Sequence, residues 1–166
     1  KGSIVEGVKY VQEKIKGSCS ILIMTDSGKL YAARDRYGRT PIVLGRKKDS
    51  MIALMESCAL PNLGYGYVRD LGPGEMVELS PEGEKTLIEP GEEMAICAFF
   101  WIYYGFPASS YEGRNVEMAR YRCGSALETL PELTQEQKIA FDGLRELVQR
   151  YESNLPTDVA QSSSID

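Results

Sequence analysis

The stretch CSILIMTDSGKLYAA, residues 19–33, decides the fold class of this chain. It places one short apolar run, Cys19 to Thr25, and a second, Leu30 to Ala33, on either side of a turn that contains Ser27 and Gly28. Two apolar runs separated by such a turn are typical of a β-hairpin. We interpret the first run as a buried strand, because it is apolar and bounded by turn residues, and we expect an antiparallel sheet.

An amphipathic helix is predicted before the hairpin. Apolar residues recur there at steps of four, three and four, which places on one helical face Ile4, Val8, Val11 and Ile15. Ser3 is a suitable N-cap and Gly17 a natural stop. We expect this helix to pack on one face of the sheet.

Turn-forming residues divide the following segment into further short strands. The expected strands are 42–44, which Gly45 ends, 51–55, 75–79, 86–89 and a mostly apolar strand region that runs to Tyr104. A short turn or helix is expected at Cys58–Leu63. Four glycines are interpreted as turn residues that need a positive φ, namely Gly38, Gly45, Gly72 and Gly74. Short strands joined by tight turns favour an α+β layer arrangement over a doubly wound parallel sheet.

The hydrophobic period changes after Gly113. A helix is predicted from Val116 to Leu130, where Pro131 ends it, and a second helix opens at Thr134 with a capping-box pattern. The apolar stripe of the second helix consists of Ala140, Leu144, Leu147, Val148 and Tyr151. From Ser153 onward the composition predicts a frayed tail. We therefore divide the chain into residues 1–113, a connecting helix at 114–130, and a helix with a flexible tail at 131–166.

Composition argues against several classes of function. The net charge is −5 and the 19 basic residues form no stripe with stacking aromatics, so no nucleic-acid groove is expected. The chain has no histidine, which rules out Ser-His and Cys-His catalysis within it. No membrane helix or signal peptide is predicted. The four cysteines, Cys19, Cys58, Cys97 and Cys123, form no C-x-x-C motif. Three of them lie in apolar runs or at helical spacing, and we interpret these as reduced, buried thiols of a cytoplasmic protein.

Four segments in this order resemble the amidophosphoribosyltransferase family of glutamine amidotransferases. They are Tyr31–Gly45, with the pattern R-D-x-x-G-x-x-P-x-x-x-G, Glu56–Leu60, with E-S-x-A-L, Arg69–Glu75, with R-D-x-x-P-G-E, and Cys97–Gly113, which Val116–Gly124 follows. The resemblance covers residues 4 to about 127. It implies an α+β fold of the N-terminal-nucleophile hydrolase type, in which an antiparallel sheet packs against helices. In this chain the fold is expected to be incomplete and to carry a C-terminal helical segment.

The resemblance also implies an activity. In that family an N-terminal cysteine, with its own α-amino group as the base, hydrolyses glutamine to glutamate, and the ammonia is channelled to a phosphoribosyltransferase domain in purine nucleotide biosynthesis. Residue 1 here is Lys1, and the family's glutamine-clamping arginine and oxyanion-hole Asn-Gly have no counterpart in the chain. We therefore expect no catalytic residue, metal site or cofactor in this chain and predict that it is inactive alone. Any magnesium of the family accompanies phosphoribosyl pyrophosphate in the other domain.

The expected partners follow from the same resemblance. They are the N-terminal half of the glutaminase domain, the phosphoribosyltransferase domain and a second copy of the chain, because a half domain leaves an unpaired sheet edge and apolar surface. No nucleic acid and no membrane is expected as a partner. A noncatalytic binding or regulatory module with the same fold is the alternative.

Phe99 and Tyr103 are the sharpest positional prediction. In the family a Phe and a Tyr at this spacing line the ammonia channel or the interdomain face. The alternative is that they pack in the core on a sheet, whose faces alternate at steps of two. The segment Tyr111–Asn115 either continues the interdomain connection or is a loop into a helix capped by Asn115.

Two Arg-Asp pairs stand beside predicted turns, Arg34 with Asp35 and Arg69 with Asp70. Such pairs are candidates for substrate contacts. We interpret them as structural, because charge-assisted hydrogen bonds beside a strand end commonly fix a turn.

Overall fold

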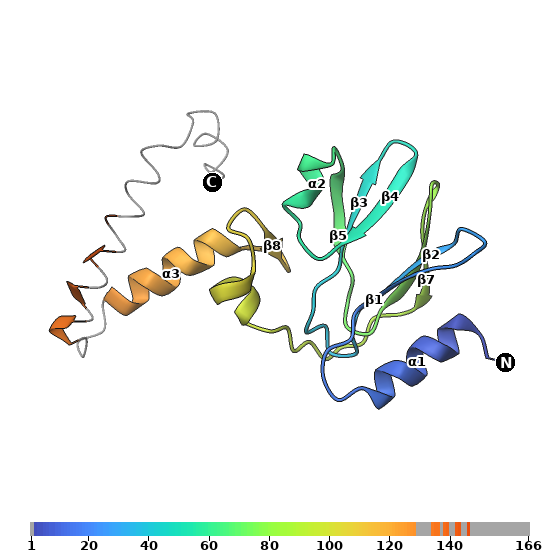
Figure 1. The fold of residues 1–166 in the computed structure, drawn as a ribbon, viewed down its shortest axis with the longest axis horizontal. Coiled ribbons are helices and arrows are strands. Elements are labelled where there is room, and N and C mark those ends of the chain that lie inside the picture. Colours follow the sequence, from blue (N-terminus) through green and yellow to red (C-terminus); the bar gives the residue numbers. More distant parts are fainter. Residues whose placement is uncertain (1, 129–133, 137, 140–141, 144–145, 147–166) are drawn as a thin grey trace. The chain divides into compact units, whose positions relative to one another are not determined.

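The computed structural model describes residues 2–128 together with 134–136, 138–139, 142–143 and 146. The chain divides into two compact units, Lys1–Arg120 and Tyr121–Asp166. The helical elements are α1 (Ile4–Lys14), α2 (Ala59–Asn62), the π-helical turn η1 (Phe100–Tyr104) and α3 (Val116–Glu128). The strands are β1 (Ile21–Met24), β2 (Leu30–Ala33), β3 (Val43–Lys47), β4 (Ser50–Leu54), β5 (Gly66–Asp70), β6 (Met76–Ser80), β7 (Gly83–Ile88), β8 (Ser110–Tyr111) and β9 (Arg114–Asn115) (Figure 1).

Every strand pair in the described residues is antiparallel, which confirms the predicted α+β class. Sheet A has the order β1-β2-β6-β7, sheet B has the order β4-β3-β5, and β8 pairs with β9 in a small hairpin. The β1–β2 hairpin joins Met24 to Leu30 and Ile21 to Ala33 in register, as the opening sequence stretch predicts.

The two sheets enclose the main core. Alternate residues of β2 and β6 face sheet B, and strand β4 packs against β6 and β7. The buried members of this cluster are Ala32, Ile42, Leu44, Ala53, Leu71, Val77 and Leu79. The opposite alternation leaves the other face of sheet A free to receive a helix.

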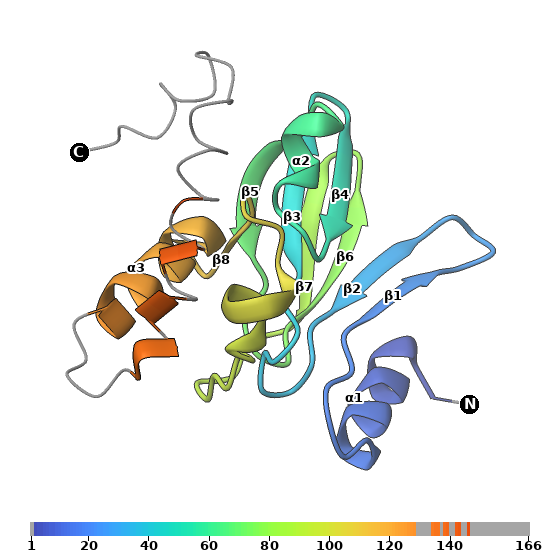
Figure 2. The ribbon, with the colours of Figure 1, turned by 60° about the vertical axis from the view of Figure 1, so that its left-hand side comes forward.

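Helix α1 covers that outer face of sheet A, so the first unit is layered as helix, sheet and sheet (Figures 1 and 2). Val8 is the buried residue of α1 and packs with Tyr31, Ala33 and Met76. The Ser3 side chain accepts the N–H of Glu6, and the Glu6 carboxylate accepts the N–H of Ser3 at 2.8 Å, so the helix begins with a capping box.

Strand β1 is not the buried strand that its apolar run predicts. Ile21 and Ile23 are half-buried, whereas Leu22 and Met24 are 53% and 79% exposed. Leu22 pairs with Ala32 of the inner core, so these two exposed side chains lie on the inner face of sheet A. Strand β1 is the edge of sheet A, and Figure 2 shows the β1–β2 hairpin extending away from sheet B. The inner face of β1 is therefore apolar and uncovered.

Two of the four turn glycines are there for close packing rather than for backbone conformation. Gly38 and Gly74 have φ of 62° and 68°, as predicted. Gly45 has no positive φ and lies inside β3, where a Cβ would collide with the side chain of Leu60. Gly72 likewise has no positive φ, and a Cβ there would collide with Pro90. Gly45 therefore does not end its strand. Its missing Cβ leaves room for Leu60 of α2 to pack against β3.

The strand region predicted up to Tyr104 does not form. After β7 the chain runs as a loop, and its apolar residues 100–104 form η1 instead. The loop is held by the backbone of the preceding turn, since the N–H of Ala95 donates to Tyr37 O at 2.7 Å and that of Cys97 to Arg39 O at 3.2 Å. Strands β5, β8 and β9 were not predicted, because residues 66–70, 110–111 and 114–115 are short or mixed in polarity.

The second unit contains the later part of α3. This helix begins at Val116, as predicted, and is described as far as Glu128. Residues 135–136, 138–139, 142–143 and 146 are helical, which agrees with the helix predicted to open at Thr134. The apolar stripe predicted for that helix and the tail from Ser153 lie outside the described residues.

Candidate functional site: an aromatic turn held by the sequence motifs

The first unit exposes a cluster of apolar side chains on the aromatic turn, which we define as residues 99–104. Phe99, Ile102, Tyr103 and Tyr104 are 63%, 62%, 80% and 65% exposed. Phe106, two residues after the turn, is also exposed. Soluble proteins rarely expose contiguous apolar clusters of this kind unless they bind something.

The turn has π-helical geometry and exposes Phe99 and Tyr103, so it does not fit the alternative of core packing on a sheet. The N–H of Gly105 donates to the carbonyl of Phe100, five residues earlier, at 2.8 Å. On such a turn Phe99 and Tyr103, four residues apart, share a face. A Cβ on Gly105 would collide with that Phe100 carbonyl and lie 2.7 Å from the Tyr111 ring, so only glycine can end the turn in this way.

Two residues of the turn anchor it. Phe100 is buried and packs edge-to-face on Tyr111, with ring centroids 5.1 Å apart, and Val116 completes the cluster. Trp101 also packs edge-to-face on Tyr111 at 5.9 Å and donates its indole N–H to Arg114 O at 2.9 Å. Phe99 and Tyr103 are thus exposed on a firmly held base.

Glu56, from the E-S-x-A-L motif, ties this base to sheet B. Its carboxylate accepts the hydroxyl of Tyr111 at 2.8 Å and the hydroxyl of Ser109. The neighbouring Ser57 hydroxyl accepts the N–H of Ser110 at 2.7 Å. Burial and the Glu56 carboxylate raise the pKa of Tyr111 above its ordinary value, which keeps the hydroxyl a donor.

Arg34 joins the R-D-x-x-G motif to the same base. Its guanidinium is fully buried and donates to Leu71 O, to Gly38 O at 2.6 Å and to the Glu112 carboxylate at 2.6 Å. Arg34 and Asp35 do not bond each other. The Asp35 carboxylate accepts the N–H of Thr40 at 2.8 Å, which closes the turn between β2 and β3.

The side chains of Arg69 and Asp70 likewise bond to other residues and not to each other. Arg69 forms a two-bond pair with the buried Glu75, at 2.9 and 2.7 Å, and a third bond to Glu84 at 2.7 Å. Hydrogen bonding to Glu75 raises the pKa of Arg69. The Asp70 carboxylate accepts the Tyr67 hydroxyl at 2.9 Å, and burial raises the pKa of Asp70.

The segment after the β8–β9 hairpin closes the site. The side-chain oxygen of Asn115 accepts the N–H of Met118 at 3.0 Å, so Asn115 caps the start of α3, as one of the two interpretations of residues 111–115 predicts. Arg120, one turn into α3, donates to Trp101 O and to Gly105 O, each at 2.8 Å. The turn is therefore held from both the sheet side and the helix side.

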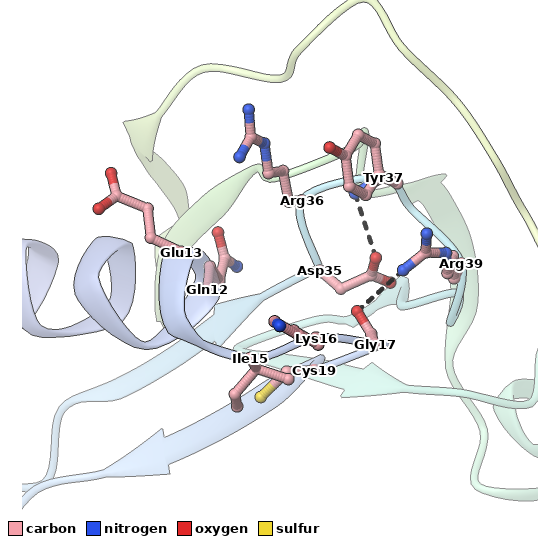
Figure 3. Close-up of a pocket in the computed structure, with 10 residues that line it drawn as sticks. All are labelled: Gln12, Glu13, Ile15, Lys16, Gly17, Cys19, Asp35, Arg36, Tyr37 and Arg39. Carbon is pink, nitrogen blue, oxygen red and sulfur yellow. Dashed lines mark hydrogen bonds between the residues drawn. The ribbon is translucent and has the colours of Figure 1, made fainter.

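A hollow of about 480 Å³ lies between the end of α1 and the turn that contains Asp35 (Figure 3). Figure 3 shows Asp35 accepting the N–H of Tyr37, and Arg39 donating to Gly17 O at 3.0 Å. The Asp35 carboxylate is therefore committed to the turn. Cys19 lines the hollow, but the chain has no histidine to serve as its base.

None of the four cysteines is fully buried, so the burial predicted for three of them is wrong, although all four are free thiols. Cys19 and Cys58 are half-buried, and Cys97 and Cys123 are exposed. Cys19 precedes β1 and Cys97 lies in the loop before η1, so neither belongs to a strand. Within the described residues no group of His, Cys, Asp and Glu side chains could hold a metal ion, and none of the helices found there is long and apolar enough to cross a membrane.

Sequence reasoning missed the residues that hold the aromatic turn. The E-S-x-A-L motif pointed to Glu56, but nothing in its spacing connects it to Tyr111, 55 residues later. Glu112 and Arg120 carry no local signal at all, because their partners are a buried arginine and two backbone carbonyls.

Comparison with known proteins identifies relatives of this chain. No protein-family model matches the chain. The amidophosphoribosyltransferase of Rattus norvegicus is 34% identical over 142 residues, which cover 74% of this chain and 27% of that protein. The human amidophosphoribosyltransferase is 31% identical over 169 residues, covering 84% and 32%, and that of Methanothermobacter thermautotrophicus is 33% identical over 129 residues, covering 76% and 27%.

Solved structures agree with these sequence relatives. The glutamine phosphoribosylpyrophosphate amidotransferase of B. subtilis, complexed with ADP and GMP, superposes with a TM-score of 0.71 at 29% identity over 81% of this chain and 30% of that one. A structure described as the allosteric regulatory enzyme of purine biosynthesis gives the same TM-score and covers 29% of its own chain. The fold is therefore the α+β arrangement of the N-terminal-nucleophile type that the sequence predicts. The chain spans between about a quarter and a third of the length of these relatives.

Proposed function

Since this chain is a partial member of the amidophosphoribosyltransferase family, we propose that it is part of a glutamine amidotransferase that hydrolyses glutamine and channels the ammonia to a phosphoribosyltransferase domain. Its role is to supply the sheets, the packing helix and the ammonia-delivery face of the glutaminase side. The whole protein serves purine nucleotide synthesis, as its relatives' names suggest.

The exposed aromatic turn is the observation that carries this proposal. Phe99 and Tyr103 share a face, are 63% and 80% exposed, and belong to a turn whose base is buried and hydrogen-bonded on two sides. Neutral ammonia keeps its lone pair only if it is kept from protons of bulk water, so an apolar aromatic wall suits its passage. The exposed face of Phe99 and Tyr103 is firmly held in this unit, so another domain can pack against it and close the channel.

The second part of the proposal is that these residues lack the groups that break the glutamine amide. Cleavage by a nucleophilic thiolate needs a base beside the thiol and donors for the oxyanion. The 166 residues contain no histidine, and the Asp35 carboxylate beside Cys19 is already engaged by the N–H of Thr40 at 2.8 Å. We therefore propose that these residues alone do not hydrolyse glutamine.

The uncovered inner face of β1 supports the proposed partners. Leu22 and Met24 are exposed on the inner face beside the free edge of sheet A, a combination that an added strand together with chain packed on that face would cover. We propose that the remaining glutaminase half of the protein pairs there, and that the whole protein forms homo-oligomers. Four free cysteines suit a reducing compartment, and we propose the cytoplasm.

Replacement of Tyr103 by Ala in the whole protein tests the channel role. We expect glutamate release to exceed synthesis from glutamine, because ammonia escapes through the opened wall, while synthesis from added ammonium salt is retained. Tyr10→Ala is the matched control, since Tyr10 is 61% exposed on α1 and lies away from the turn. If Tyr103→Ala keeps one product for each glutamate released, the channel role is wrong.

A further inference from the structure

Arg120 holds the end of the aromatic turn by two directed hydrogen bonds. Its Nε–H donates to Trp101 O and its Nη2–H to Gly105 O, each at 2.8 Å. The last carbonyls of a helical turn have no partner within the turn, and a cation there also meets the negative end of the helix dipole. A planar guanidinium can bond both carbonyls at once, whereas a lysine ammonium acts as a single point of charge.

The aromatic turn is bonded more directly to the start of α3 than to the sheets. Trp101 donates to Arg114 O at 2.9 Å, and Phe100 packs in a buried cluster with Val116. The link to sheet B runs at one remove, through Tyr111 and its bond to Glu56. A shift of the first turn of α3 therefore moves the two clamped carbonyls directly.

Resting on the proposed function, we propose that Arg120 is a positioning residue that sets the orientation of Phe99 and Tyr103 for ammonia transfer. Arg120 is the last residue of the first unit, and the chain passes from it into the second unit at Tyr121. Arg120 thus fixes the aromatic wall to the helix by which the chain leaves this unit. The residue touches neither glutamine nor ammonia and acts through the backbone of the turn.

The test uses Arg120→Gln and Arg120→Lys in the whole protein. Gln keeps one donor group without charge, and Lys keeps the charge without the fork, so a residue that needs both carbonyls fails with either variant. Arg122→Gln is the matched control, because Arg122 is an exposed arginine two residues further along α3. Synthesis from added ammonium salt serves as the internal reference for each variant.

We expect the ratio of glutamate released to ammonia incorporated to rise about threefold in both Arg120 variants, a size typical of residues that modulate coupling without touching a ligand. Amide hydrogen exchange across residues 101–105, followed by mass spectrometry, should speed up with it, because the clamp on the carbonyls of Trp101 and Gly105 is lost. The Arg122 variant should change neither value.

An unchanged ratio in a folded Arg120→Lys or Arg120→Gln protein, even with lowered stability, would reduce Arg120 to a structural cap and overturn the inference. The positioning role of Arg120 and the channel role of Tyr103 can fail independently of each other. If Tyr103→Ala uncouples the reaction and the Arg120 variants do not, only the positioning role is wrong. If Tyr103→Ala leaves the reaction coupled, the channel role itself is wrong.

Discussion

Replacing Tyr111 by Phe should destabilise the base of the aromatic turn without removing any of its packing. The Tyr111 side chain is 1% exposed, and its hydroxyl donates to Glu56 at 2.8 Å. A hydrogen bond to a charged group contributes about 1.5–3 kcal/mol. The ring contacts with Phe100 and Trp101 remain, so we expect the free energy of unfolding to fall by about 2 kcal/mol.

A double-mutant cycle with Glu56→Ala isolates this bond. The truncation removes the acceptor of both Tyr111 and Ser109, so Glu56→Ala should cost more than Tyr111→Phe. Residues in one hydrogen-bond network show coupling energies of about 0.5–3 kcal/mol, and we expect about 1–2 kcal/mol for this pair. Independent effects that simply add would show that the two groups do not interact in solution.

Urea unfolding measured in two ways is the assay. Fluorescence of Trp101, whose ring centroid is 5.9 Å from that of Tyr111, reports on the turn, and circular dichroism reports on the sheets. Tyr31→Phe is the matched control, because Tyr31 is 7% exposed in the core beneath α1 and its hydroxyl is not engaged like that of Tyr111. If Tyr111→Phe costs no more than Tyr31→Phe, the argument that Glu56 anchors the turn is refuted.

Three further predictions concern the sheets and α1. Gly45→Ala should lower the free energy of unfolding by about 1–3 kcal/mol through overpacking against Leu60, whereas Gly66→Ala on the paired strand β5, where the nearest atom is 3.7 Å from the new Cβ, should cost clearly less in the same urea titration. The pKa of Asp70 is raised above 3.8 in the folded state, so the folded state binds this proton more tightly than the unfolded state and the free energy of unfolding falls as the pH rises through that pKa. Measured against the unmodified protein, Asp70→Asn should therefore be more stabilising at pH 7 than at pH 4. An equal effect at both pH values would contradict this. Gly7→Ala, at an exposed position of α1 with open space around the new Cβ, should raise the thermal midpoint by stabilising the helix by about 0.5–1 kcal/mol, and a lowered midpoint would show that α1 does not form as described.

The sequence predicted the elements whose signals are local. The hairpin at residues 19–33 needs only two apolar runs and a turn, and the capping box at Ser3 and Glu6 needs only a spacing of three. The resemblance to a family added the N-terminal-nucleophile type of fold. These levels agree with each other, which is why the sequence alone predicts the fold class.

The sequence failed where burial or conformation depends on distant partners. The apolar run at β1 looks buried, yet Leu22 and Met24 are exposed because sheet B packs on the other strands. Apolar residues 100–104 match a strand as well as a helix by composition, and short apolar runs do not distinguish the two. Gly105 was a usable signal, since a glycine after such a run can end a helical turn.

The candidate site was predicted in part. Phe99 and Tyr103 were identified through the family resemblance, and the structure places them on one exposed face, but their channel role stays a prediction. The residues that hold this face, Glu56 and Arg120, were assigned no role, because their partners are 55 and 15–19 residues away. Long-range polar contacts of this kind leave no periodic trace in a single sequence.

Glutamate release from glutamine by the purified 166-residue chain is the measurement that tests the central claim most directly. The claim is that these residues form the scaffold and ammonia-delivery face of a glutaminase and carry none of the groups that break the amide. We predict no release above buffer and no cysteine labelled by a glutamine-analogue affinity reagent. Release together with labelling of Cys19, Cys58, Cys97 or Cys123 would place the chemistry inside this chain and contradict the account.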